Sequence, residues 1–204
     1  MSEPPHPGSL TVLLFRHPQT DWNTERRYQG RTDRPWSPQG QERADHLAST
    51  PTLPSFDHII HSPRGHARRL AESLASGTTP LLEDDRWAEI DHGNWEGLTY
   101  NEVSERFPDS CKERFADPLN CESHGGETLS VLHTRVLSAW NDLPQQADGP
   151  TVALVTHATP IQVVLCHLTG LPVERHWQFR IDCGSITSLE ITSGGTIINY
   201  CNRL

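Results

Sequence analysis

Arg16 and His17 are adjacent and directly follow a short apolar run, and they are the first pair in the chain whose side chains could take part in a reaction. The run, residues 10–15, reads Leu-Thr-Val-Leu-Leu-Phe and is typical of a buried central strand. A neutral imidazole can attack phosphorus, and a planar guanidinium binds phosphate oxygens in a bidentate way. The pair therefore predicts a phosphate site at the end of a strand, with His17 as the nucleophile.

Two further polar groups follow predicted strands in the same way. Arg64 comes just after an apolar segment at residues 56–61, and His157 ends another at residues 152–155. In open α/β sheets, ligands bind at the carboxyl ends of the strands. We therefore expect Arg16, Arg64 and the two histidines to converge on one phosphate.

The reaction also needs a proton donor, and the candidate is Glu89 in the segment Ala-Glu-Ile-Asp-His-Gly. This segment lies within residues 87–95, which are expected to form a loop, and from it a carboxyl group could face the pocket. Asp91 and Glu96 are rival acids in the same stretch.

The segments that carry these residues alternate between strand and helix patterns. Ser37 and Pro38 resemble an N-cap followed by a first-turn proline. The alternation predicts an α/β fold, a three-layer α/β/α sandwich with a mainly parallel central sheet. We expect residues 1–9 to be a flexible tail and residues 10–204 to form a single catalytic domain. Expected strands span residues 10–15, 56–61, 80–82, 152–155, 185–191 and 196–200, and expected helices span residues 37–48, 65–76, 99–107, 127–143 and 160–168.

Composition narrows the classes of function. The net charge is −9, without a long basic run, so we expect binding neither to nucleic acid nor to an anionic membrane. The mean hydropathy is −0.58, and we expect no membrane span and no cleaved signal peptide. Five cysteines lack any Cys-x-x-Cys pair, which favours free thiols in a cytoplasmic protein.

At the residues singled out above, the chain resembles the histidine phosphatase superfamily, the phosphoglycerate-mutase-like enzymes, and within it the broad-specificity and α-ribazole phosphatase branch. The resemblance extends from Leu10 to about Leu171, with the motifs in the family's order. Each motif is weak alone, and the six together are specific. They are Arg16-His17-Pro18-Gln19-Thr20 with Trp22-Asn23; Tyr28 to Asp33 with Ser37 to Gly40; Ser62-Pro63-Arg64 with Ala67 and Ala71; Glu89 to Gly97; Gly125 to Thr128 with Arg135; and Val155-Thr156-His157.

The resemblance implies a metal-independent phosphomonoesterase that acts on a small phosphorylated metabolite through a phosphohistidine at His17. Arg16, Arg64 and His157 would hold the non-bridging oxygens, and Glu89 would protonate the leaving oxygen. Substrate-binding residues would be Asn23, Gln29 and Gly30.

The chain departs from the family at two places. Pro18 stands where glycine is usual, which removes a backbone donor beside the nucleophile, and Ala158-Thr159 replaces a common glycine pair. Neither change removes a reactive group.

Alternatives remain open at this stage. A phosphoglycerate-type phosphomutase would return the phosphate to a reoriented substrate, and a non-catalytic phospho-ligand-binding module would keep the pocket without turnover. A homodimer is also left open. Arg26, Arg27, Arg31 and Arg34 could steer anions or be solvated surface charge. The remaining histidines, His66 among them, show no ligand spacing on one element, so we expect no metal site and no cofactor.

Overall fold

The computed structural model describes residues 8–121 and 125–204, and the first strand explains the arrangement of the rest. Strand β1 (Leu10–Arg16) is the predicted apolar run and is almost fully buried. It pairs in parallel with β4 (Thr151–Thr156) and antiparallel with β5 (Ile186–Thr192). Because β1 has a neighbour on each side, its carboxyl end lies in the interior of the sheet.

The sheet confirms the predicted fold class. Its six described strands are ordered β3-β2-β4-β1-β5-β6. The pairs β3–β2, β2–β4 and β4–β1 are parallel, whereas β5 is antiparallel to both of its neighbours. The sheet is therefore mixed. The carboxyl ends of β2, β4 and β1 point the same way and lie next to one another. The other three strands are β2 (His58–His61), β3 (Leu81–Glu83) and β6 (Gly195–Arg203).

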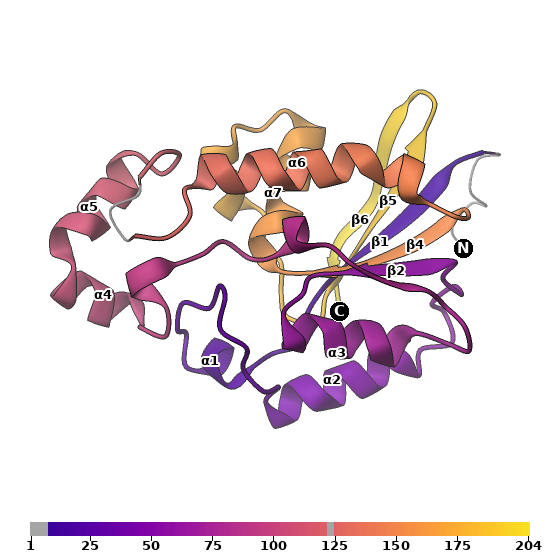
Figure 1. Ribbon diagram of the computed structural model, residues 1–204, viewed down its shortest axis with the longest axis horizontal. Helices are drawn as coiled ribbons and strands as arrows, with labels where there is room; N and C mark the ends of the chain where they lie inside the picture. Colours follow the sequence, from indigo (N-terminus) through magenta and orange to yellow (C-terminus); the bar gives the residue numbers. More distant parts are fainter. Residues whose placement is uncertain (1–7, 122–124) are drawn as a thin grey trace.

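Helices cover both faces of the sheet, as the alternating pattern predicted (Figure 1). On one face, buried side chains of α6 and α7 pack with alternate residues of β1 and β4. On the other face, α2 and α3 pack against the opposite set. Each helix supplies one apolar stripe, so burying it drives the assembly of the three layers. The four helices are α2 (Pro38–Ala48), α3 (Gly65–Leu74), α6 (Leu129–Gln146) and α7 (Ala158–Thr169).

The helix signals at α2 are confirmed in detail. The Ser37 side chain accepts a hydrogen bond from the Gly40 N–H, and Pro38 occupies the first turn. Gly40 packs closely on the preceding loop, where a Cβ would lie 2.0 Å from the Gln19 carbonyl oxygen. Glycine is therefore required at this point, where α2 packs against the loop that follows His17.

A small helical extension lies away from the sheet, at the left of Figure 1. It has its own apolar cluster, in which Trp95, Val103 and Cys111 are buried. The helix at residues 99–107 was predicted, but the helix that follows it was not. The stretch at residues 87–95, expected as a loop, contains short 3₁₀ turns. The extension contains α4 (Tyr100–Arg106), α5 (Pro108–Ala116) and the 3₁₀ turn η2 (Gly93–Trp95). Elsewhere lie the short helix α1 (Asp21–Thr24) and the 3₁₀ turns η1 (Asp85–Trp87) and η3 (Val173–Gln178).

Two expectations fall on segments that the structure does not describe, or describes only in part. The tail expected at residues 1–9 is described only from residue 8 onward. Residues 123–126, whose Ser-His-Gly-Gly sequence predicts an inserted loop, are described only from residue 125 onward. Among the residues that are described, none of the helices combines the length and apolar character needed to cross a membrane.

Candidate active site

The backbone of the predicted nucleophile is held from both sides of β1. The His17 N–H donates to the Thr156 carbonyl oxygen of β4 at 3.0 Å. The Gly184 N–H donates to the His17 carbonyl oxygen, also at 3.0 Å. These bonds fix the point at which the chain leaves the sheet, so the imidazole projects from a rigid position.

The imidazole of His17 is oriented by its own neighbour. Its Nδ1 lies 2.8 Å from the Pro18 carbonyl oxygen. A carbonyl can only accept, so Nδ1 carries the proton and the lone pair of the neutral ring is on Nε2. Burial, followed by the charges of His66 and Arg16, lowers the pKa of His17 well below its usual 6.5. His17 is thus a neutral base with an available lone pair at neutral pH.

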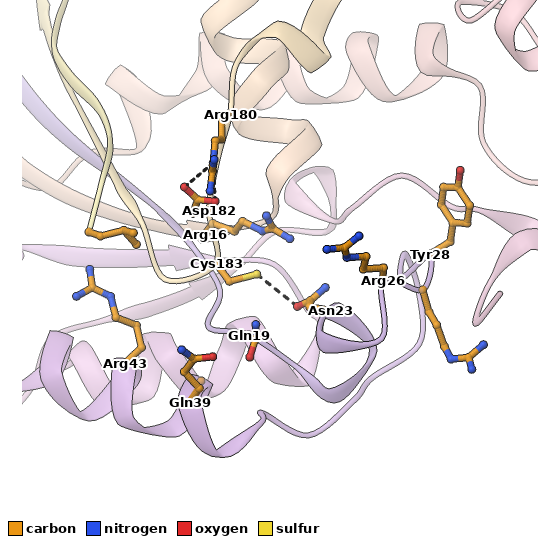
Figure 2. Close-up of a pocket in the computed structure, with 13 residues that line it drawn as sticks. Arg16, Gln19, Asn23, Arg26, Tyr28, Gln39, Arg43, Arg180, Asp182 and Cys183 are labelled. Atoms are coloured by element: carbon orange, nitrogen blue, oxygen red, sulfur yellow. Dashed lines mark hydrogen bonds and ion pairs between the residues drawn. The ribbon is translucent and has the colours of Figure 1, made fainter. Parts of the chain in front are cut away.

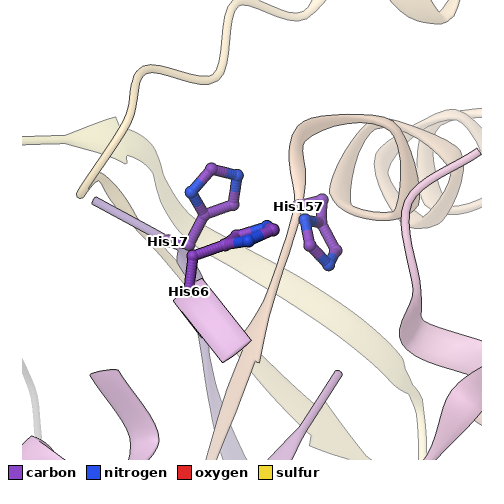
Figure 3. Close-up of side chains that lie close together, drawn as sticks. All are labelled: His17, His66 and His157. Carbon is purple, nitrogen blue, oxygen red and sulfur yellow. The ribbon is translucent and has the colours of Figure 1, made fainter. Parts of the chain in front are cut away.

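Two further imidazoles pack around His17, and we call His17, His66 and His157 the histidine cluster (Figure 3). The centroid of the His17 ring lies 4.4 Å from that of His66 and 5.1 Å from that of His157. His157 Nε2 is 2.8 Å from Ser62 Oγ, at the end of β2. Burial, and then the charges of the other two histidines, lowers the pKa of His157 as well.

His66 is the member that the sequence analysis missed. It lies on the buried face of α3, one turn before Leu70, and its side chain is almost inaccessible to solvent. Its Nδ1 is 3.3 Å from Asp33 Oδ1 and 3.5 Å from Gln29 Nε2. Burial outweighs the nearby Asp33 carboxylate and lowers the pKa of His66 to about 4. The available signal was its helical spacing with Ala67, Leu70 and Ala71, which places it on the sheet-facing side.

Arg16 joins the histidine cluster to a neighbouring cavity of about 750 Å³ (Figure 2). Its charge lowers the pKa of His17 and of His157, so it lies within electrostatic range of both rings. Its Nη1 donates to the Ile181 carbonyl oxygen, and its buried Nε has no hydrogen-bond partner among the described residues. Arg16 is therefore anchored at one end and has a donor left for a ligand.

Arg64, the second predicted phosphate ligand, lies farther from the centre. Its Nη1 donates to the Arg31 carbonyl oxygen at 3.1 Å, and its Nη2 is 3.6 Å from Asp85 Oδ1. It still lowers the pKa of His66, though less than burial does. The structure thus brings Arg64 to the margin of the histidine cluster, and its role as a phosphate ligand stays a prediction.

Glu89 is the buried carboxyl group of its loop. Its Oε1 accepts from the Ile90 N–H at 2.8 Å, and its Oε2 accepts from the Thr159 N–H at 3.2 Å, in the first turn of α7. Burial outweighs these bonds and raises its pKa. The rival acids are engaged elsewhere: Glu96 accepts from the Gly30 and Thr32 N–H groups, and Asp91 accepts from the Gly93 N–H.

Arg135 holds the loop that carries Glu89. Its Nη2 donates to the Glu89 carbonyl oxygen at 3.1 Å, and its Nη1 donates to the Ala88 carbonyl oxygen at 2.7 Å. Its Nε and Nη2 also form a bidentate pair with the Glu127 carboxylate, both at 2.7 Å. Since Arg135 is on α6, this network ties the acid loop to a helix of the main core.

The three predicted substrate-binding residues occupy different positions. Asn23 lines the cavity, and its Oδ1 accepts from the Thr20 N–H. The Gln29 side chain accepts from the Thr20 hydroxyl at 2.6 Å and reaches His66. The Gly30 N–H is bound by Glu96. Asn23 is thus placed to meet a ligand, whereas Gln29 and Gly30 shape the surrounding loop.

The predicted basic patch separates into paired and unpaired side chains. Arg27, Arg31 and Arg34 each lie within 4 Å of carboxylates. Arg26 makes no ion pair with any described residue and lines the cavity, where Figure 2 shows its guanidinium directed toward Arg16. Its backbone is left-handed, with φ of 57°, a conformation that costs a non-glycine residue about 1–2 kcal/mol.

Comparison with known proteins settles the family. The model of the histidine phosphatase superfamily (branch 1) matches residues 12–203. The chain belongs to the histidine phosphatase superfamily. The resemblance read from its motifs is thus confirmed.

Similar proteins include one named as a phosphatase and one named as a probable mutase. Phosphoserine phosphatase 1 of Hydrogenobacter thermophilus is 29% identical, over 95% of this chain and 92% of its own length. The probable phosphoglycerate mutase GpmB of Escherichia coli O1:K1 is also 29% identical, over 89% of this chain and 85% of its own. Among solved structures, Bacillus stearothermophilus YhfR superposes with a TM-score of 0.86 at 26% identity, covering 96% of this chain and 98% of its own.

Proposed function

We propose that this protein is a metal-independent phosphomonoesterase that forms a phosphohistidine at His17. The observation that carries the proposal is the hydrogen bond from His17 Nδ1 to the Pro18 carbonyl, because it leaves Nε2 unprotonated beside Arg16. The proline that replaces the usual glycine gives up an N–H but keeps this carbonyl.

In the first step, Nε2 of His17 attacks phosphorus in line, and the bond to the ester oxygen breaks. Arg16 neutralises charge on the non-bridging oxygens. When the Ser62 hydroxyl donates to His157 Nε2, Nδ1 of that neutral ring carries a proton for a phosphoryl oxygen. Arg64 would join them by exchanging its contact with Asp85.

Glu89 supplies the proton that the leaving oxygen needs. Its raised pKa favours the protonated carboxyl, the form required of a general acid. After it has given up the proton, the carboxylate accepts one from the water that hydrolyses the phosphohistidine. The Ile90 and Thr159 N–H groups and the loop network of Arg135 hold this carboxyl in place in both states.

We further propose that the substrate is a small metabolite whose leaving group carries a second anionic group. The cavity beside Arg16 is lined by Arg26 and Arg43, neither of which pairs with a carboxylate among the described residues. A relative named phosphoserine phosphatase 1 acts on such a compound by its name. Arg26→Gln should raise KM for phosphoserine at least about tenfold, because one charge-assisted contact to the second anionic group is lost. The KM for phenyl phosphate, which lacks that group, should stay nearly unchanged.

The test compares wild type, His17→Ala and the exposed-histidine control His46→Ala on p-nitrophenyl phosphate with EDTA present. We expect release by wild type and by the control, none by His17→Ala, and an acid-labile phosphoenzyme in wild type alone. Negligible release by all three proteins across pH would favour a phospho-ligand-binding module. Isomerisation of 3-phosphoglycerate without phosphate release would favour a mutase.

A further inference from the structure

The histidine cluster has the composition of a metal site as well as that of a phosphate pocket. His17, His66 and His157 each offer a ring nitrogen, and these three atoms lie within 4.8 Å of one another. Imidazole is the ligand that zinc, copper and nickel share, whereas magnesium and calcium prefer oxygen. We propose that the histidine cluster binds one divalent transition-metal ion, Zn²⁺ in the first place, and that this ion inhibits the enzyme by occupying the nucleophile.

His66 supplies the independent observation that points to a ligand. Its Nε2 is buried and has no hydrogen-bond partner among the described residues, whereas its Nδ1 faces the Asp33 carboxylate at 3.3 Å. The Gln29 amide nitrogen lies 3.5 Å from the same Nδ1. A carboxylate can only accept, so the neutral tautomer that keeps the shorter of these two contacts has its proton on Nδ1 and its lone pair on Nε2. A buried lone pair directed at two other imidazoles is poorly matched to a phosphate dianion and well matched to a cation.

The other two rings are also fixed from behind, as histidine ligands of metals generally are. His17 donates from Nδ1 to the Pro18 carbonyl, and His157 contacts the Ser62 hydroxyl through Nε2. Each ring thus has one nitrogen engaged by the protein and one left over. A carbonyl and a carboxylate are common outer partners of metal-bound histidine, and the Ser62 hydroxyl oxygen can accept from His157 Nε2 in the same way.

The distances indicate a site that closes on its ion. Ligand nitrogens of a tetrahedral zinc site lie about 3.3 Å apart, given Zn–N bonds of about 2.0 Å. The rings therefore need to move inward by about 1 Å, which side-chain rotation provides. The Arg16 and Arg64 guanidinium groups oppose the charge of the ion, while the Asp33 carboxylate offsets part of that repulsion. This balance suits a reversible inhibitor rather than a resident cofactor.

The inhibition rests on the proposed function, whereas the binding does not. A metal on Nε2 of His17 takes up the lone pair that would attack phosphorus, so no phosphohistidine forms while the ion is bound. The inhibitor should therefore compete with phosphate esters.

The experiment titrates Zn²⁺ into the full chain after EDTA dialysis, with calorimetry as the readout, and repeats the titration with Co²⁺ and visible absorption. We expect one ion per chain and the spectrum of tetrahedral nitrogen coordination. His66→Gln should weaken Zn²⁺ binding more than about 100-fold, because loss of an outer partner alone costs about 10–100-fold. Asp33→Asn tests that outer partner and should cost about tenfold. The Asp33 side chain is exposed, and the amide oxygen of asparagine can still accept the hydrogen bond from the Gly65 N–H. The control is His46→Gln, which should bind as wild type does.

The outcomes distinguish the proposed metal site from the proposed phosphatase function. Three results would each overturn the metal site. They are an unchanged Zn²⁺ affinity in folded His66→Gln, no stoichiometric Zn²⁺ binding by wild type, and a Co²⁺ spectrum with a thiolate charge-transfer band. If wild type binds Zn²⁺ but releases no phosphate from any ester, the site stands and the proposed function fails. If wild type hydrolyses esters and Zn²⁺ neither binds nor inhibits, the proposed function stands and the metal site is overturned.

Discussion

Replacing Glu89 by glutamine removes the proposed proton donor while changing the shape of the side chain very little. The carboxyl now accepts from the Ile90 and Thr159 N–H groups. The amide keeps one of these bonds and places its own N–H₂ toward the other donor. We therefore expect a loss of about 1 kcal/mol in the free energy of unfolding. The loss in activity should be far larger, because general acid catalysis contributes about 10²–10⁴-fold, or about 3–5 kcal/mol of activation free energy.

The leaving group makes this prediction specific. Nitrophenolate departs without a proton, whereas an alkoxide such as that of phosphoserine needs one. The value of kcat/KM reports only the steps up to formation of the phosphohistidine, so it does not contain the later step in which Glu89 acts as a base. For Glu89→Gln it should fall by at least about 100-fold on phosphoserine and by much less on p-nitrophenyl phosphate. The matched control is Asp91→Asn, in the same loop, and should retain its rate on both. An equal loss on the two substrates in a folded Glu89→Gln protein would refute the role of Glu89 as the acid.

Three further results are expected. Arg135→Met leaves the buried Glu127 carboxylate unpaired, so it should cost about 3–5 kcal/mol in chemical unfolding and lower kcat by freeing the acid loop. Gly30→Ala places a Cβ 2.1 Å from the Ile90 carbonyl oxygen, so it should lower Tm and kcat together, whereas Gly194→Ala, with ordinary contacts, should change neither. Because the pKa of each cluster histidine is lowered on folding, stability falls as pH drops below about 6.5, down to about 4 for His66. His66→Gln should therefore show a smaller decrease in Tm between pH 7.5 and pH 5 than wild type, even though Glu89 acts in the opposite direction.

Local chemistry made most of the fold predictable. The apolar run of β1 and the Ser37-Pro38 start of α2 are properties of neighbouring residues, and both are confirmed. α5 was missed because only Cys111 of its residues is buried, so no apolar stripe marks it. The antiparallel direction of β5 depends on how the preceding chain connects to the sheet. The residues of β5 themselves carry no signal of that direction.

The site was predictable where residues follow strands. His17 and His157 meet because β1 and β4 are adjacent parallel strands. His66 was hidden because it comes from a helix, and only the packing of α3 against the sheet brings it to the other two. The division of the basic patch into paired arginines and Arg26 likewise depends on acidic partners distant in sequence, such as Glu102 for Arg27.

The backbone bonds around the nucleophile also have a consequence for synthesis on the ribosome. Gly184 donates to the Arg16 and His17 carbonyl oxygens, and Arg16 donates to the Ser185 carbonyl, across more than four-fifths of the chain. Every predicted catalytic side chain has therefore been translated before the segment that holds the first of them emerges. Such non-local contacts form late, because loop closure opposes them. The growing chain thus contains all the predicted catalytic side chains before they can form a site. The proposed phosphatase activity therefore begins only when β5 has docked.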